Sequence, residues 1–429
     1  MEKTGKTKYV ISAFFVLMAH ISMLYSMFYN GNYDSPSKLI VLAMAVIGLD
    51  ISYFIAMLFF KQTTYTIDFM LIFILNISLI FQSSFGGIQL SVKHLITCIA
   101  SLVACRLGYI LCRDHKWLQT KKKAFYIATG IIMFVILTLT GSRSMWIDLG
   151  FFTIQPSEFL KPAFILVCTT YVAEQQNKIS VLNFNIVPEN LICTGFIILI
   201  CGLQWWCRDL GSLPTFVAIY LCGLCARLCY PKAKLSKKLI ITGIALLGVL
   251  AIVAVILAPP YVKARLFVDI WSDSTGDGYQ QSQALIAIAN GGWFGKGAGN
   301  GDLHNIFAYE TDLVFASICE EWGLFFALMV VSVILIMLAC PLVNPPRSYF
   351  HATLATGVCS AFVVQMALNI FGSCNMIPFT GVTVPFISQG GSSMVTCGFM
   401  MGMLIAGQSP VFKNPVVKNN KKRKRVTAR

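Results

Sequence analysis

Residues 309–340 read YETDLVFASICEEWGLFFALMVVSVILIMLAC. The first four residues are polar and include the carboxylates Glu310 and Asp312, and the apolar run from Leu313 to Cys340 follows at once. A membrane-spanning helix takes roughly 20 apolar residues, with about 17 to 25 tolerated. The stretch therefore predicts a membrane helix with an acid held at its mouth.

The segment before this helix is a long polar insert. Residues 259–312 are mostly polar and glycine-rich, and they separate two long apolar runs. A loop of this length is uncommon unless it has a function. We expect a large extramembrane loop that ends in the two carboxylates.

The composition makes the whole chain a polytopic membrane protein. It is 57% hydrophobic and 12% charged, with a mean hydropathy of +0.73. In hydrocarbon a helix satisfies its own backbone, so we predict an all-α bundle. Twelve apolar runs are candidate spans: 9–28, 37–60, 67–82, 93–112, 124–140, 158–173, 190–206, 212–229, 238–258, 313–340, 349–371 and 391–408.

Positive charge sets the predicted orientation. Lys and Arg collect in cytoplasmic loops, and twelve spans with a cytoplasmic N-terminus place every basic cluster on that side. The clusters are Lys3 to Lys8, Arg113 to Lys123, Arg227 to Lys238, Arg347, and Lys413 to Arg429. The net charge of +15 is thus a topology signal and not a sign of nucleic-acid binding. The basic tail, residues 409–429, also suits anionic lipid head groups.

Five motif-bearing segments carry a resemblance on the opposite, outer side. They are Gly141 to Gly150 with Gln155 to Lys161, Asp209 to Ser212, Gly278 to Gly297, Glu310 to Gly323, and Pro378 to Ser393. In this order they resemble the signatures of the SEDS family, the peptidoglycan glycosyltransferases FtsW, RodA and SpoVE. The resemblance covers residues 141–408, and it leaves residues 1–140 as N-terminal spans with an added helix pair, since the family usually has ten spans.

The resemblance implies a reaction and a place. Family members polymerise lipid II, a disaccharide-pentapeptide on undecaprenyl pyrophosphate, at the outer face of the bacterial cytoplasmic membrane, in division, elongation or sporulation. The family's essential aspartate corresponds to Asp312. A carboxylate can take the proton from the acceptor hydroxyl, so Asp312 is the expected general base of an inverting-type transfer. Capping of the helix at Leu313 is the structural alternative for this residue, and the helix N-terminus would keep the acid ionised.

The departing pyrophosphate needs cationic or N–H donors as its charge develops. Arg265 and Lys296 are the cationic candidates. The run from Gly390 through Gly391 and Ser392 to Ser393 is either an anion site or a tight helix contact of small residues.

Further candidates for substrate binding come from the same motifs. They are Trp146, Glu158, Lys161, Glu310 and Ser388. Glu158 and Lys161 lie three residues apart on one helical face, so we expect them to pair with each other. Glu320 and Glu321 are expected in a buried polar network or in contact with Lys161.

The chain departs from the family pattern at several places. Met145 stands where an arginine precedes the tryptophan, Arg208 replaces a proline, Phe307 to Tyr309 replaces the usual lead into the acid, and Gln389 replaces a tyrosine. The added N-terminal pair contains or adjoins two unassigned acids, Asp50 and Asp68.

Two other functions stay open from the sequence. One is a lipid II flippase, because transporters also use intramembrane acids and glycine-interrupted helices; the other is a non-catalytic scaffold for a penicillin-binding protein. The family implies a class B penicillin-binding protein transpeptidase as partner. No resident cofactor or histidine metal site is expected, and a divalent cation at the pyrophosphate stays open.

Overall fold

The computed structural model describes most of the chain. The described residues are 3–60, 65–139, 146–148, 150, 153–172, 179–181, 184–186, 188–228, 268, 270–272, 277–346 and 348–408. The predicted span 238–258, the candidate Arg265 and the basic tail lie outside these residues.

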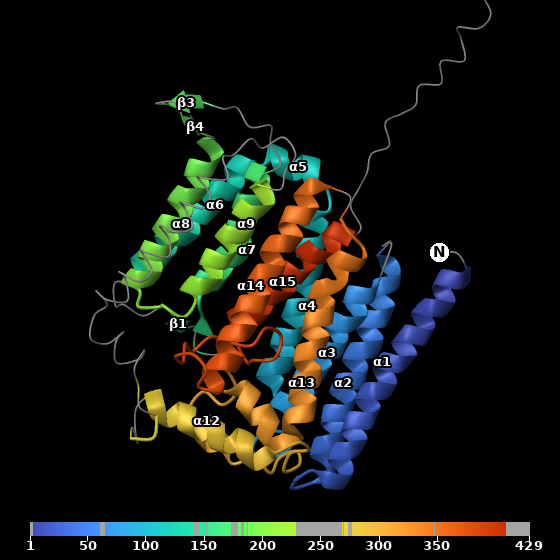
Figure 1. Cartoon of the computed structure of the whole chain (residues 1–429). Coiled ribbons are helices and arrows are strands. Elements are labelled where there is room, and N and C mark those ends of the chain that lie inside the picture. Colours follow the sequence, from blue (N-terminus) through green and yellow to red (C-terminus); the bar gives the residue numbers. More distant parts are fainter. Residues whose placement is uncertain are drawn as a thin grey trace, which may run out of the picture.

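Long helices dominate the described chain, as expected (Figure 1). The N-terminal helices are α1 (Lys3–Asn30), α2 (Pro36–Phe59), α3 (Thr66–Gln82), α4 (Val92–Cys112), α5 (His115–Thr120) and α6 (Lys122–Leu139). The later helices are α7 (Pro156–Val172), α8 (Pro188–Trp206), α9 (Leu213–Leu228), α12 (Asp277–Gly291), α13 (Val314–Val343), α14 (Tyr349–Ser373) and α15 (Gly391–Gln408), with a short 3-10 turn, η2 (Leu303–Asn305). Helices α2, α7 and α8 each begin at a proline, a residue suited to a first turn that needs no N–H donor.

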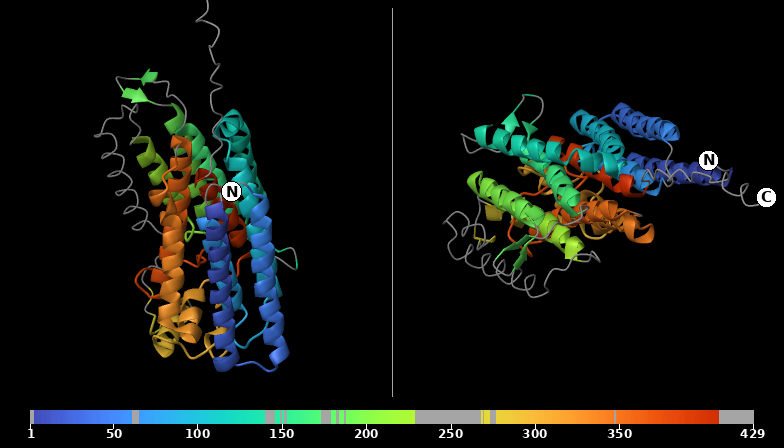
Figure 2. Two further views of the ribbon diagram at one scale, coloured as in Figure 1. Left: turned by 90° about the vertical axis from the view of Figure 1, so that its right-hand side faces the viewer. Right: turned by 90° about the horizontal axis from the view of Figure 1, so that it is seen from above.

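Two short antiparallel ribbons complete the described secondary structure. Strand β1 (Ile147–Asp148) pairs with β2 (Thr153–Ile154), with Ile147 opposite Ile154. Strand β3 (Ile179–Val181) pairs with β4 (Phe184–Ile186), with Ile179 opposite Ile186. The ribbons lie toward opposite ends of the bundle (Figures 1 and 2).

The helical bundle confirms the predicted fold class. Eleven of the twelve predicted spans coincide with described helices. Five of these, α1, α2, α4, α13 and α14, are long and apolar enough to cross a membrane by length and composition. The count of twelve spans stays a prediction.

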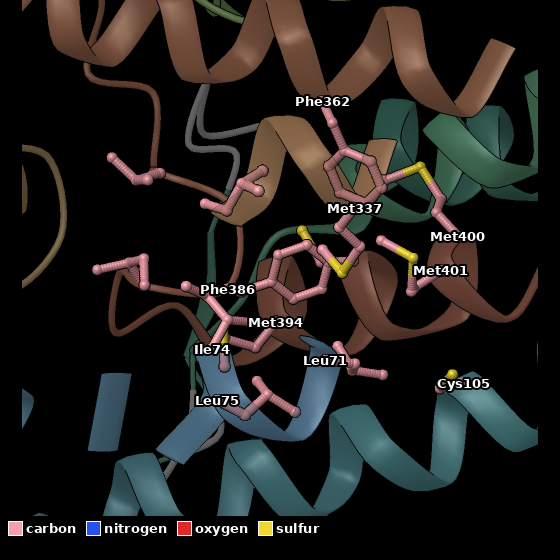
Figure 3. Close-up of a cluster of buried hydrophobic side chains, with 14 of the residues drawn as sticks. Leu71, Ile74, Leu75, Cys105, Met337, Phe362, Phe386, Met394, Met400 and Met401 are labelled. Carbon is pink, nitrogen blue, oxygen red and sulfur yellow. The ribbon is translucent and has the colours of Figure 1, made fainter. Parts of the chain in front are cut away.

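Small residues bring α4 and α15 into backbone contact at the centre. A Cβ on Gly398 would lie 2.1 Å from the Ser101 carbonyl oxygen, and one on Gly402 would lie 2.0 Å from that of Cys105. Such close approach is typical of helix pairs in membranes. Beside this contact lies a methionine-rich core that includes Met337, Met394, Met400, Met401 and Phe386 (Figure 3).

The polar insert and the helix after it differ from the expectation. The insert contains the helix α12, which lies across one end of the bundle and packs against α13 (Figure 1). Helix α13 is broken at Gly323, where φ is 88° and ψ is 163°. Residues 292–301, the glycine-rich loop, fill the break: Lys296 N–H donates to the Glu320 carbonyl, and Leu324 N–H donates to that of Gly292.

Candidate active site

A cavity of about 490 Å³ opens at the end of the bundle that holds α12 and the β1–β2 ribbon. Four of the five motif segments contribute to its walls. The lining includes Trp146, Gln155, Glu158, Lys161, Asp209, Ser212, Glu310, Asp312, Gly381, Thr383, Gln389, Gly390, Gly391, Ser392 and Ser393. The structure therefore brings together nine of the residues that sequence reasoning selected, from segments up to 247 positions apart (146 to 393).

Asp312 sits in a tight turn just before α13. Ala308 has a positive φ of 64°, and its carbonyl accepts hydrogen bonds from the N–H groups of Thr311, Asp312 and Leu313. The N-cap of α13 is Leu313, with no side-chain cap bond. The capping role considered for Asp312 is therefore wrong, and its carboxylate lines the cavity instead.

Burial sets the protonation of Asp312. It raises the pKa of this carboxyl from 3.8 to about 6, and a hydrogen bond with Thr311 opposes the shift. At this pKa the carboxyl is mostly ionised near neutral pH. A contribution of the helix N-terminus to its ionisation stays a prediction. The wall opposite is close: a Cβ on Gly381, at φ 64°, would lie 3.3 Å from Asp312 Oδ2.

Three buried side chains hold the backbone of the acid segment, which we define as residues 309–312. Gln82 Nε2 donates to the Glu310 carbonyl at 2.9 Å, Ser388 Oγ donates to that of Thr311 at 2.6 Å, and Asn369 Nδ2 donates to that of Asp312 at 2.7 Å. The two amides also reach the last loop, residues 374–390: Gln82 bonds the Ile387 carbonyl and Asn369 bonds that of Val382. The acid segment is thus fixed to α3, α14 and the last loop together.

Glu158 and Lys161 form the expected ion pair, which is buried. Lys161 Nζ lies 2.7 Å from Oε1 and 2.8 Å from Oε2 of Glu158, and the two side chains are 1% and 7% exposed for Lys161 and Glu158. Lys161 also donates to Gln365 Oε1 at 3.2 Å, and Gln365 Nε2 donates to the Thr383 carbonyl at 3.1 Å. The pair is therefore tied to the last loop that covers the cavity.

Asp209 forms a second acidic wall. Its Oδ2 accepts from Ser212 Oγ at 2.6 Å and from Gln155 Nε2 at 3.3 Å. Burial raises the pKa of this carboxyl, and the Ser212 hydrogen bonds lower it in part. Gln155 N–H donates to Ser392 Oγ at 3.2 Å, which links this wall to the start of α15.

Two predicted ligands lie elsewhere. Lys296 Nζ is paired with Asp302 at 2.9 Å and with Glu320 at 2.8 Å, so its ammonium is not offered to the cavity. Ser388 faces the acid segment and not the cavity lining. Glu320 belongs to a polar network, as one of the two expectations had it, but its carboxylate contacts Lys296 and the N–H groups of Asp302 and Leu303 and not Lys161.

Sequence reasoning missed the amides Gln82, Gln365 and Asn369. Their signal was available, because a polar residue in an apolar helix needs a partner within the bundle. All three are buried and lie within α3 or α14.

A family model described as cell cycle protein, FtsW/RodA/SpoVE, matches residues 56–409. The chain belongs to this family. Among its relatives, the stage V sporulation protein E of Bacillus subtilis is 31% identical over 66% of this chain and 75% of its own. The protein named "Probable peptidoglycan glycosyltransferase FtsW" from Pseudomonas fluorescens is 30% identical over 74% of this chain and 78% of its own.

Two solved structures share the fold of this FtsW/RodA/SpoVE chain. A chain from "Structural coordination of polymerization and crosslinking by a peptidoglycan synthase complex" matches with a TM-score of 0.60 at 19% identity, over 80% of this chain and 96% of that one. The rod shape determining protein RodA of Thermus thermophilus matches with a TM-score of 0.52 at 17% identity, over 80% and 95%. Membership of this family and the five long apolar helices show that this is a multi-pass protein of the cytoplasmic membrane.

Proposed function

We propose that Asp312 is the general base of this chain, a peptidoglycan glycosyltransferase that polymerises lipid II in division, elongation or sporulation. The relatives named as glycosyltransferases support the activity, and one observation supports the site: the cavity whose lining joins four of the motif segments contains the Asp312 carboxylate. Asp312 takes the proton from the acceptor sugar hydroxyl. That oxygen bonds to the anomeric carbon of the donor as the bond to the pyrophosphate oxygen breaks.

The start of α15 is the best candidate for the leaving group. Gly390, Gly391, Ser392 and Ser393 line the cavity at a helix N-terminus, where N–H groups and the helix dipole favour an anion. The packing glycines of this helix are Gly398 and Gly402, further along. Whether a divalent cation joins the pyrophosphate is part of the same test.

An apolar groove beside the cavity suits the lipid carrier. It has a volume of about 260 Å³ and is lined mainly by Ile96, Ala100, Phe159 and Val395. It shares Thr153, Gly391 and Ser392 with the cavity. A prenyl chain lying in the groove would therefore place its pyrophosphate at the start of α15.

The wider architecture belongs to this proposal. Twelve spans with both termini in the cytoplasm put the cavity at the outer face, residues 1–140 before a core of 141–408, and the tail 409–429 against anionic lipids inside. A class B penicillin-binding protein is the proposed partner, since the solved relative of higher TM-score comes from a peptidoglycan synthase complex.

Labelled lipid II in proteoliposomes tests the function. The purified full chain with its class B penicillin-binding protein is expected to convert lipid II into glycan strands. Movement of lipid II across the bilayer without polymer formation would instead indicate a flippase. If the protein neither moves nor polymerises lipid II but still sustains cell-wall synthesis in cells, it is a scaffold. Added EDTA measures the need for a divalent cation.

The pH dependence of polymerisation should report Asp312. A general base acts only when ionised, and the pKa of Asp312 is raised to about 6. Thus kcat/KM should be full above that value and fall about 10-fold per pH unit below it. Initial rates between about pH 4.5 and 8 measure this acid side of the pH–rate profile. Thermal unfolding followed in parallel shows whether the protein stays folded over the same range. An undiminished rate at about pH 4.5 would contradict the assignment.

Loss of the Gln82 clamp should slow the reaction. Gln82→Leu removes the side-chain donor from the Glu310 and Ile387 carbonyls. Each carbonyl keeps one other donor, Gln389 N–H at Glu310 and Ser78 Oγ at Ile387. The cost is therefore that of two lost hydrogen bonds, about 1–3 kcal/mol together, and we expect polymerisation to fall roughly 10-fold with a lower melting temperature. Gln89→Leu, at an exposed side chain in the loop that follows α3, is the matched control and should behave as wild type.

A further inference from the structure

The hairpin of α1 and α2 stands outside the family pattern. The family match begins at residue 56, so α1 and all but the end of α2 precede it. The helices are joined by turn 31–35, at the same end of the bundle as α12 (Figure 1). A membrane anchor alone would need no contact between this turn and the loops that follow α3 and α12.

One residue of the turn joins two neighbouring loops. Asn32 N–H donates to the Ala298 carbonyl at 2.8 Å, in the glycine-rich loop. The Asn32 carbonyl accepts from Ile88 N–H at 3.1 Å, in loop 83–91. Both bonds are between backbone groups, so the turn extends a small hydrogen-bonded layer across three segments.

The contact is too close for side chains. A Cβ on Gly297 would lie 2.7 Å from the Asn30 carbonyl oxygen, and one on Gly299 would lie 2.7 Å from that of Asn32. Both glycines have positive φ, 98° and 82°. The glycine-rich loop thus fits against the hairpin in a conformation that glycine adopts readily.

The buried carboxylate of Glu321 also holds the same two loops. It accepts from Gly86 N–H at 3.1 Å and from Gly299 N–H at 2.9 Å. Glu321 lies on the part of α13 between Asp312 and the break at Gly323. The loops are therefore clamped between the hairpin turn and the helix that starts at the acid.

Loop 83–91 reaches the acid segment directly. Trp322 Nε1 donates to Ser84 Oγ at 3.1 Å, and the rings of Phe85 and Tyr309 lie 6.2 Å apart. Just before the loop, Gln82 bonds the Glu310 carbonyl. A displacement of this loop would therefore shift the backbone within two residues of Asp312.

We propose that the α1–α2 hairpin is a positioning element of the active site, which braces loops 83–91 and 292–301 through Asn32 and so fixes the acid segment. Loops held by few bonds open readily, and small misplacement of a reacting group costs much of its rate. The effect on activity rests on the proposed polymerase function, whereas the effect on the loops does not.

The test places a wedge in the turn of the full chain. A Cβ on Gly31 would lie 2.5 Å from Ile88 Cδ1 and 2.4 Å from the Met27 carbonyl oxygen, whereas one on Gly48, in α2 of the same hairpin, would meet nothing within 4 Å. Gly31→Val is expected to speed hydrogen exchange of the amides of Ile88, Gly297 and Gly299 about 10-fold or more. With lipid II, kcat should fall roughly 10-fold with KM unchanged, and Gly48→Val should change neither.

A second pair of variants keeps the test decisive if Gly31→Val does not fold. Gly299→Ala places a methyl group against Asn32, and Gly292→Ala, also at positive φ, meets nothing within 4 Å. If the hairpin braces the loops, only Gly299→Ala should show faster hydrogen exchange at the Ile88 amide and a lower kcat.

Two results would overturn the brace: wild-type exchange at Ile88 in a folded wedge variant, or faster exchange with an unchanged kcat. If the wild-type protein makes no polymer, the proposed polymerase function is wrong. The hydrogen-exchange rates then still test whether the hairpin braces the loops.

Discussion

Lys161→Met is expected to lower the free energy of unfolding by about 3–5 kcal/mol and to remove most polymerising activity. The substitution leaves Glu158 buried without the ammonium that lies 2.7 and 2.8 Å from its two oxygens. It also takes the donor from Gln365, which bonds Thr383 of the last loop. Denaturant unfolding in detergent micelles measures the first effect, and lipid II polymerisation measures the second.

A double variant separates the structural part of this pair from its part in the cavity. Glu158→Gln with Lys161→Met removes both charges, so most of the lost stability should return. Activity should stay low, because both side chains line the cavity. Recovery of full activity would show that the pair only supports the fold. Lys38→Met is the matched control: its partner Asp34 is 84% exposed, and such a pair contributes about 0–1 kcal/mol.

The helices and most of the site could be predicted from the sequence. An apolar run in a membrane has to form a helix to satisfy its backbone, so run lengths located eleven described helices. The motif segments fall at helix ends that the charge pattern places on one side, and for that reason Trp146, Glu158, Lys161, Asp312 and the start of α15 meet in one cavity.

What the sequence did not predict depends on contacts between distant segments. Gly323 stands in an apolar run, and only the backbone of residues 292–297, filling the break, makes it a helix end. Lys296 looked like a phosphate ligand because its carboxylate partner Glu320 is 24 positions away. Gln82 and Asn369 resembled other polar residues of apolar helices until the folded acid segment supplied the carbonyls that they bind.

Asp312→Asn is expected to abolish catalysis while preserving the fold. The amide keeps the size of the side chain but cannot accept the proton, and a general base contributes about 10²- to 10⁴-fold to the rate. Burial raises the pKa of this carboxyl, so its ionised form is costly in the folded protein. The melting temperature near neutral pH should therefore equal or exceed that of wild type.

The same variant gives the most direct test of Asp312 as the general base. Purified wild type and Asp312→Asn, each with the class B penicillin-binding protein, are given labelled lipid II in the same proteoliposomes, and the glycan strands are resolved on a gel. We expect a ladder of strands from wild type and at least about 100-fold less product from a folded Asp312→Asn protein. Equal ladders from the two proteins would contradict it.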